Sequence, residues 1–490
     1  MGGLVMDILL IYPSLTVEER YGRKGLSDVG GNLPPLGIAQ LASSLESRGF
    51  SAALIDAVVL NMDENDVLNE IGKIKPRAVG ISAVTPVFHR AAALSTLIRK
   101  RFPSILIILG GHHATIVPEQ VLEEQPCIDI VGCGEGEETL CEIMEKYRSK
   151  KYSREDFLGD YHMLKGVKGI GFRRKDGSVH LTKPREPIED LDSLPFPARH
   201  LLPMEKYLPL PNQYKRRPVV NMVFIRGCPY QCSFCSNTAI YGRHVRYKSP
   251  ARAMEEIKNV VERYGARELS FWDDTFTTNR KWVEDLCRRL IESRIGVIWS
   301  CYGSVGTVDP ELLKLMKRAG CWNIFYGFES GNQRLLDNIS KGITIDEIRK
   351  TARWTHEAGI EIRASFMLAL PGETPEMARE TLDLALELEP EYVQFSFTTP
   401  FPRTRLYEEV QRYGRLNHSF SEYYGWIPVF VPFGYKDREE IMRIHRWMTR
   451  RFYFRPAYIL RMLSKIRTWE DLNRYVKGLR VAARFVLSMH

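Results

Sequence analysis

Residues 226–236 read Arg-Gly-Cys-Pro-Tyr-Gln-Cys-Ser-Phe-Cys-Ser, and this loop decides how the rest of the chain is interpreted. It holds Cys228, Cys232 and Cys235 at C-x3-C-x2-C spacing, and the next cysteine, Cys287, lies beyond a predicted helix and strand. Thiolates bind iron–sulfur cubanes, normally four to a cluster. Three thiolates would leave one iron open for chemistry, just as a catalytic zinc site keeps an open position. The loop therefore predicts a 4Fe–4S cluster with one exchangeable iron position.

Structural zinc is the alternative for this loop, with His244 as the fourth ligand. Zinc sites usually combine C-x2-C pairs from two knuckles, whereas this loop offers one knuckle and a lone histidine. A zinc-stabilised nucleic-acid-binding protein would also need a basic working face. The net charge is +9, but residues 443–490 carry twelve Lys or Arg against two acidic residues, so the rest of the chain is close to neutral. We expect no nucleic-acid partner.

A strand-and-helix alternation begins directly before the cysteine loop. Helical patterns such as 251–264 and 375–388 separate six predicted strands. Six such units are too few for a closed eight-fold barrel. We therefore predict a partial (β/α)6 TIM-like barrel over residues 219–434. Its predicted strands are 219–225, 269–272, 297–301, 323–328, 361–368 and 392–397.

Residues 1–150 show the same alternation with five predicted strands. The continuous apolar run at 7–12 is typical of a strand that is covered on both faces. We predict a doubly wound, Rossmann-like α/β domain in this part of the chain. Residues 151–218, with a hairpin signal at 175–177 and many prolines, are predicted to form a connector. Residues 435–490 are predicted to form a helical, basic C-terminal extension.

The cysteine loop and its position after the first barrel strand resemble the radical S-adenosylmethionine (SAM) enzymes. In that family the open iron chelates SAM, and reductive cleavage yields a deoxyadenosyl radical. The resemblance covers residues 219–415, strand end by strand end. It assigns SAM contacts to the aromatic residue before the last cysteine, to carboxylates at two strand ends and to an arginine in the fifth strand: Phe234, Asp273, Asp274, Glu329 and Arg363.

Asp273 and Asp274 also allow a purely structural interpretation. Aspartate is a favoured N-cap residue, and a helix is predicted to start near Asn279. One aspartate could meet the SAM amine while the other caps the helix.

The α/β domain ahead of the barrel resembles the cobalamin-binding domain of one large radical SAM subgroup. Ligands bind such sheets at the carboxyl ends of the strands, and glycines there let the backbone approach a flat macrocycle closely. Cobalamin proteins with a histidine lower ligand use an Asp-x-His-x-x-Gly loop, but residues 13–34 contain no histidine. A domain that keeps the fold without cobalamin is the alternative. The resemblance assigns cobalamin contacts to Ser82, Thr85, Gly110, Gly111, His112, Gly134 and Glu135.

Together these resemblances imply a cobalamin-dependent methyltransferase that acts on an unactivated carbon. Aromatic residues beside arginines in the tail, such as Phe452, Tyr453 and Trp469, favour a hydrophobic small-molecule substrate, such as a lipid or a tetrapyrrole. The alternative keeps the machinery without methyl transfer, and the chain is then a cyclase, an oxidoreductase or a carbon–carbon coupling enzyme. Either activity needs an electron donor such as ferredoxin or flavodoxin.

The composition, 44% hydrophobic and 26% charged, excludes a disordered chain. We find no apolar run near the ~18 residues of a membrane span and no signal-peptide pattern, and we expect a cytoplasmic enzyme. In the basic tail, apolar residues recur at three- and four-residue spacing between arginines, which suits packing on its own domain. The more specific expectation is that this tail makes peripheral contact with the anionic inner face of the membrane.

Overall fold

The computed structural model describes residues 6–15 and 30–487, which form two compact units. The N-terminal unit contains residues 6–15, 34–207 and 239–241. The barrel unit contains residues 30–33, 208–238 and 242–487. Each unit has its own sheet, as expected for separate domains with separate cores.

The N-terminal unit is built on a seven-stranded sheet of order β2-β1-β3-β4-β5-β6-β7. The first five strands are parallel, and the last two join the edge of β5 in antiparallel pairing. The strands are β1 (Ile8–Tyr12), β2 (Ala52–Asp56), β3 (Ala78–Ser82), β4 (Leu106–Gly110), β5 (Ile130–Gly132), β6 (Ile170–Arg173) and β7 (Val179–Leu181).

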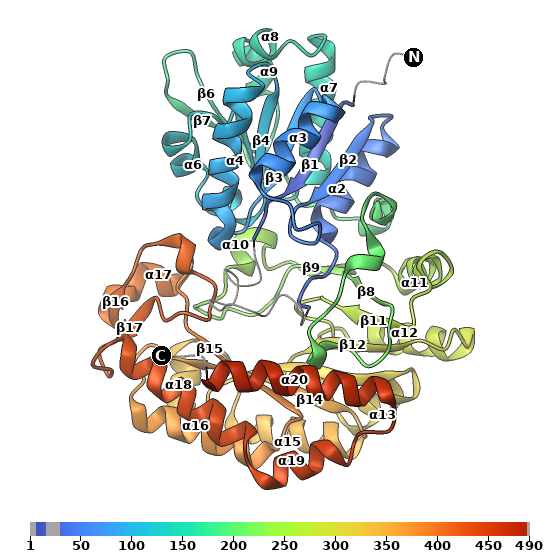
Figure 1. Cartoon of the computed structure of the whole chain (residues 1–490), viewed down its shortest axis with the longest axis vertical. Coiled ribbons are helices and arrows are strands. Elements are labelled where there is room, and N and C mark those ends of the chain that lie inside the picture. Colours follow the sequence, from blue (N-terminus) through green and yellow to red (C-terminus); the bar gives the residue numbers. More distant parts are fainter. Residues whose placement is uncertain (1–5, 16–29, 488–490) are drawn as a thin grey trace. The chain divides into compact units, whose positions relative to one another are not determined.

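Helices cover both faces of this sheet (Figure 1), because its central strands are apolar on both sides. On one face the core is formed with α3 (Glu64–Ile74), α4 (Phe88–Arg101) and α6 (Pro118–Glu124). On the other face it is formed with α2 (Leu36–Ser47), α7 (Gly136–Ser149), α8 (Arg154–Gly159) and α9 (Tyr161–Lys165). The short α5 (His112–Ile116) follows β4 at the carboxyl end of the strands.

The hairpin predicted inside the connector belongs to this first sheet. Ile170 pairs with Gly132 and Phe172 pairs with Ile130, and the Phe172 ring is buried in the core. The N-terminal unit therefore extends to residue 207, whereas a domain of residues 1–150 followed by a connector of residues 151–218 was expected. The apolar side chains of β6 account for the difference, because they complete the edge of the sheet.

The barrel unit is built on six parallel strands in the order β15-β14-β13-β12-β11-β8. Its first and last strands do not pair, so the sheet is an open, partial barrel as predicted. The strands are β8 (Val219–Met222), β11 (Glu268–Phe271), β12 (Ile298–Gly303), β13 (Cys321–Glu329), β14 (Glu361–Leu368) and β15 (Tyr392–Phe397). The helices between them are α11 (Pro250–Tyr264), α12 (Arg280–Ser293), α13 (Pro310–Arg318), α14 (Gln333–Asn338), α15 (Ile345–Glu357) and α16 (Pro375–Leu388).

The two faces of the barrel sheet differ in polarity. Side chains alternate between faces along each strand. In β15 the residues Val393, Phe395 and Phe397 are buried, while the alternate positions are half-buried and include Gln394 and Ser396. The buried set packs toward the helices, so the inward face is polar rather than apolar. It is half-buried along β15 and buried at Ser270, Ser300 and Asn323 on the other strands.

The C-terminal extension is helical as predicted and packs on the barrel. It consists of α18 (Arg438–Tyr453), α19 (Pro456–Leu463) and α20 (Trp469–Leu487), and α20 contacts both α18 and residues 211–213 just before β8. It follows a small subdomain made of α17 (Arg405–Glu409), β16 (Gly414–Leu416) and β17 (Phe430–Pro432). In the described part of the chain no helix combines the length and hydropathy of a membrane span.

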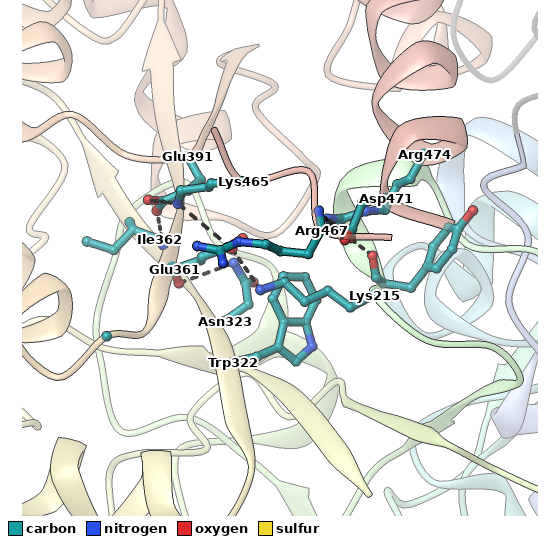
Figure 2. Close-up of polar contacts among 12 residues, drawn as sticks. Lys215, Trp322, Asn323, Glu361, Ile362, Glu391, Lys465, Arg467, Asp471 and Arg474 are labelled. Carbon is teal, nitrogen blue, oxygen red and sulfur yellow. Dashed lines mark hydrogen bonds and ion pairs between the residues drawn. The ribbon is translucent and has the colours of Figure 1, made fainter. Parts of the chain in front are cut away.

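Ion pairs hold the extension against the amino-terminal end of the strands, here called the barrel floor (Figure 2). Lys465 Nζ lies 2.7 Å from Glu391 Oε1 and 3.8 Å from Glu361 Oε1, and Lys215 Nζ lies 2.7 Å from Glu361 Oε1. The buried guanidinium of Arg474 donates to the carbonyl of Tyr214 at 2.9 Å. Part of the positive charge of the tail is therefore paired within the molecule.

Candidate functional site

The cysteine loop leaves β8 and is closed at its base by a short antiparallel pair. The pair is β9 (Ile225–Arg226) with β10 (Arg246–Tyr247). Gly227 has φ of +94°, and a side chain there would run into the carbonyl of His244, so glycine is required before the first cysteine. The amide of Cys228 donates to the carbonyl of Gly242 at 3.3 Å.

The far side of the loop is fixed to the barrel through the residues between the second and third cysteines. The amide of Ser233 donates to the carbonyl of Ile339 at 2.8 Å, and the amide of Leu406 donates to the carbonyl of Ser233 at 2.9 Å. Phe234 packs against an apolar cluster formed by Leu335, Ile339, Met367 and Leu370. Its ring therefore anchors the loop on α14 and β14, a role that the sequence did not predict.

Cys228, Cys232 and Cys235 are half-buried free thiols, and burial raises the pKa of each, that of Cys235 to about 11. The described residues contain no group of three or more His, Cys, Asp or Glu side chains gathered around a single ion position. Tetrahedral zinc needs four such ligands on one ion, whereas each thiolate of a cubane binds a different iron. The side chain of His244 is exposed. The donor set, three cysteine thiols on one loop, is the kind that an iron–sulfur cubane uses.

Asp273 is a structural acceptor beneath the loop. Its Oδ1 accepts hydrogen bonds from the amides of Phe224 and Ile225, at 2.6 and 2.7 Å, where β8 turns into β9. The side chain is 1% exposed, and burial raises the pKa of Asp273 to about 7. Asn279, not an aspartate, is the N-cap of α12, accepting from the amide of Trp282 at 3.1 Å. The N-cap interpretation of this aspartate pair was therefore wrong.

Asp274 differs from Asp273 in exposure and in hydrogen bonding, two properties that decide whether a carboxylate can meet a ligand. It is exposed, and within the described chain its side chain accepts one hydrogen bond, from the amide nitrogen of Asn237 at 2.6 Å. Its charge raises the pKa of both Cys228 and Cys235, after the larger effect of burial, so the carboxylate lies within electrostatic range of the loop. Of the two aspartates, Asp274 is the one placed to meet a ligand amine.

Glu329 ends β13 in a left-handed conformation, with φ of +63°, and forms an ion pair with Lys341 at 2.7 Å. Left-handed backbone in a non-glycine residue is uncommon and concentrates at functional sites. Burial opposes the charge of Lys341, but Glu329 and the thiols of Cys232 and Cys235 together raise the pKa of this lysine. Lys341 is a site residue that sequence reasoning missed. Its short loop, Ser340-Lys341-Gly342, carries no motif that could have revealed it.

Arg363 is not at the strand ends where Glu329 lies. Its Nε donates to Asn323 Oδ1 at 2.7 Å on the inward face of the sheet, and the side chain is 4% exposed. Arg363 pairs with Phe325 in the strand register, whereas Glu329 pairs with Phe366, three residues further along β14. At about 3.3 Å per residue the two levels are roughly 10 Å apart.

The N-terminal unit gathers the residues assigned to cobalamin at the carboxyl ends of β3, β4 and β5. Ser82 and Gly110 end neighbouring strands and pair with each other in register. Gly111 has φ of +94° and lies against the backbone of Ala83. A side chain at Gly110 or Gly134 would meet open space, so the backbone at this edge is accessible to a flat ligand.

Four of the assigned side chains at this edge have different surroundings. Thr85 is buried and bonds His113, whose ring stacks on Phe88, and burial lowers the pKa of His113 to about 4. Glu135 accepts from the amide of Ile188 at 3.0 Å. His112, at the start of α5, is half-buried, and burial lowers its pKa. Thr85 and Glu135 thus have structural partners, whereas Ser82 and His112 remain at the edge of the strands.

Comparisons with known proteins identify the family. The radical SAM superfamily model matches residues 222–385, and the B12 binding domain model matches residues 22–144. An uncharacterized methyltransferase of Pyrococcus horikoshii is 32% identical over 97% of this chain and 98% of that protein. The anaerobic magnesium-protoporphyrin IX monomethyl ester cyclase of Rubrivivax gelatinosus is 30% identical over 96% of this chain and 81% of the cyclase. The chain belongs to the radical SAM superfamily, among the members that carry a B12 binding domain.

Solved structures share the fold. The cobalamin-dependent S-adenosylmethionine radical enzyme OxsB, solved with aqua-cobalamin and SAM, matches with a TM-score of 0.72 at 17% identity, over 98% of this chain and 72% of OxsB. The radical SAM methyltransferase TsrM of Kitasatospora setae, solved with cobalamin and a [4Fe-4S] cluster, gives 0.66 at 19% identity, over 84% of this chain and 78% of TsrM. The predicted family, fold class and enzymatic nature, with SAM and cobalamin as the cofactors, are confirmed.

Proposed function

We propose that this chain is a cobalamin-dependent radical SAM methyltransferase that acts on an unactivated carbon of a hydrophobic small molecule. The observation that carries the proposal is the group around the cysteine loop: three thiols, the exposed carboxylate of Asp274 and the Glu329–Lys341 ion pair lie within electrostatic range of one another. When bound, the cofactors supply radical generation and a transferable methyl group.

Different residues of the barrel unit would bind the cluster and SAM. Cys228, Cys232 and Cys235 would hold the 4Fe–4S cluster, since their thiols are free and mutually close. Asp274 would accept hydrogen bonds from the SAM amine, a charge-assisted contact. Glu329 would accept from the SAM ribose or amine.

Lys341 acts on the electrostatics of this group. Its positive charge lies beside Cys232 and Cys235 and stabilises their thiolate forms, which are the forms that bind iron. It also holds the carboxylate of Glu329 in place. The lysine is thus a positioning residue that connects the cluster ligands to the SAM site.

The cluster assignment has a direct test. Anaerobic reconstitution of the wild type should load about four irons more than reconstitution of a variant with all three loop cysteines changed to alanine. A matched control changes Cys127, Cys141 and Cys287, which are buried thiols outside the loop, to alanine and should keep the iron. A loop variant that retains the full iron load would overturn the assignment.

Methyl transfer can be separated from its alternative by the product. The Rubrivivax relative is a cyclase and is 30% identical over most of both chains, so cyclisation without methyl transfer is the second candidate. Incubation with SAM carrying a labelled methyl group, a reductant of the ferredoxin or flavodoxin class and cobalamin should place the label in product. Turnover of SAM in which the label stays in methionine and appears in no product derived from the substrate, with or without cobalamin, would favour the cyclase or oxidoreductase alternative.

The substrate class and the membrane contact remain proposals. Relatives named for tetrapyrrole and hopanoid substrates support a hydrophobic substrate. On α19 and at the start of α20, Leu460, Leu463 and Trp469 are exposed by 66, 55 and 80%. Residues 450–469 carry six Lys or Arg and no acidic residue, so the charge of this segment is complementary to an anionic bilayer surface. We place the peripheral contact on this segment rather than on the whole tail, because Arg474 in α20 is buried against the barrel. Within the segment, Lys465 is paired with Glu391 and leaves five of the six basic residues.

A further inference from the structure

The inward face of the barrel sheet holds a buried cation that has no carboxylate partner in the described chain. Among the described strand residues on this face, Arg363 is the one positively charged side chain. It shares the face with small polar groups such as Ser270 and Ser300, whose hydroxyls lie 3.4 Å apart. The alternate residues of the same strands pack outward, as Tyr326 does when it bonds Thr355 of α15.

The protein satisfies Arg363 only in part. Its Nε donates to Asn323 Oδ1, and its guanidinium lies 5.1 Å from the ring centroid of Phe325 and 5.9 Å from that of Tyr302. Within the described chain no carboxylate comes within 4.0 Å of the guanidinium, and neither Nη1 nor Nη2 has a hydrogen-bond acceptor. A guanidinium carries five N–H donors in a planar fork. Most of this fork is therefore without a protein partner, although the side chain is only 4% exposed.

Two acidic side chains at the barrel floor already have partners. Glu268 accepts from the amides of Lys215 and Arg216 and from the indole of Trp322. Glu361 pairs with Lys215 and Lys465 (Figure 2). Burying a charge without a partner is unfavourable unless another group compensates it. An anionic group from a bound molecule would supply that compensation.

Aromatic rings lie beside the guanidinium, and a third ring contacts one of them. Trp272 is 39% exposed, and its ring contacts that of Tyr302 edge-on at 5.8 Å. Phe325 is in turn 5.0 Å from Tyr302. A ligand that reached Arg363 would place its apolar or aromatic body against these three rings.

We propose that Arg363 anchors a carboxylate of the substrate, whose hydrophobic body lies against Trp272, Tyr302 and Phe325. The inference rests on the proposed function and narrows its substrate class to acids. The level of Arg363, roughly 10 Å along the strand from that of Glu329, separates it from the SAM contacts at the strand ends. A planar guanidinium matches a carboxylate with two parallel hydrogen bonds. A neutral polycyclic lipid would leave the cation unpaired.

Titration of the reconstituted enzyme with protoporphyrin IX and with its dimethyl ester tests this, since the two probes differ only in the carboxylates. Fluorescence should show that the wild type binds the diacid more tightly than the ester. Arg363→Met should weaken diacid binding roughly 10- to 150-fold, the value of one charge-assisted hydrogen bond, and leave ester and SAM binding unchanged. Arg363→Lys should bind the diacid with an affinity between those of the wild type and Arg363→Met. Arg289→Met, on the exposed face of α12, is the matched control.

Two results would overturn the inference. Equal affinity of the wild type for the diacid and the ester, or no binding of either, would remove the carboxylate anchor, and this comparison needs no variant. A loss of SAM affinity in Arg363→Met with porphyrin binding unchanged would assign the arginine to SAM instead. Failure of the proposed function is a separate observation, because it would show as a wild type that does not cleave SAM, whatever the porphyrin result.

Discussion

Asp273 and Asp274 are adjacent in sequence, but substitutions at the two positions should have different effects on stability and on ligand binding. Asp273 accepts two amide hydrogen bonds at the start of the cysteine loop and is buried. Removing it in Asp273→Ala leaves two buried N–H groups without a partner, at about 1–3 kcal/mol each, or about 2–6 kcal/mol in total. Asp274 is exposed and supports no backbone group. Asp274→Ala should therefore leave the free energy of unfolding almost unchanged.

The two variants are separated by melting, iron content and SAM affinity. Asp273→Ala should lower the melting temperature by roughly 4–24 °C, at about 2–4 °C per kcal/mol for a domain of 150–250 residues. It should also load less iron. Asp273→Asn keeps one acceptor oxygen and should lose less stability. Asp274→Ala should melt and load iron like the wild type but bind SAM roughly 10- to 150-fold more weakly.

The control and the refuting result are equally specific. Asp285→Ala removes an exposed carboxylate from α12 and should behave as the wild type in all three measurements. If Asp273→Ala melts normally with full iron, or if Asp274→Ala loses its iron, then the division of roles between the two aspartates is wrong.

Three shorter predictions follow from other contacts. Lys341→Met should leave Glu329 as an unpaired, largely buried carboxylate, at about 3–5 kcal/mol, and should make the cluster harder to reduce in an anaerobic redox titration. Glu391 is held by the ammonium of Lys465, the imidazole of His356 and the amide of Ile362, which together outweigh the effect of burial and lower its pKa to about 2. Its stabilising effect is therefore complete above the unfolded pKa near 4.3 and lost as pH falls toward 2, and Glu391→Gln should cost about 3 kcal/mol at pH 7 and flatten the acid limb of the stability curve. Vesicle co-sedimentation should show salt-sensitive binding to anionic but not neutral liposomes, reduced by combined Leu460→Ser and Trp469→Ser; binding that does not depend on lipid charge would contradict it.

The sequence predicted the barrel strands and the cysteine loop because both are carried by local patterns. A parallel strand is a short apolar run, and the loop is a spacing of three residues of one type. The division of labour between Asp273 and Asp274 was not predictable, since it depends on which carboxylate turns toward the amides of Phe224 and Ile225. The proximity of Lys341 to the loop likewise arises from the path of the chain after α14.

The C-terminal tail also shows that local sequence patterns do not reveal tertiary contacts. Its periodicity predicted helices correctly, but it could not reveal that one basic residue lies inside. Arg474 is 3% exposed and bonds the carbonyl of Tyr214, although the sequence places it among residues that resemble a solvated basic face. The role of β6 was also hidden. A hairpin signal predicts the turn at 175–177 but not the sheet that the hairpin joins.

Because of the contacts at the barrel floor, the barrel cannot form all of its ion pairs until the C-terminal extension has been synthesised. Glu391 enters the sheet with β15, but its partner Lys465 is translated about 75 residues later, roughly 4–15 s at bacterial-like elongation rates of about 5–20 residues per second. The last helix, α20, then reaches residues 211–213, which precede the first barrel strand. A nascent chain on the ribosome therefore carries a barrel in which Glu391 lacks Lys465 until the C-terminal extension has been made, and a premature stop before Lys465 removes that ion pair.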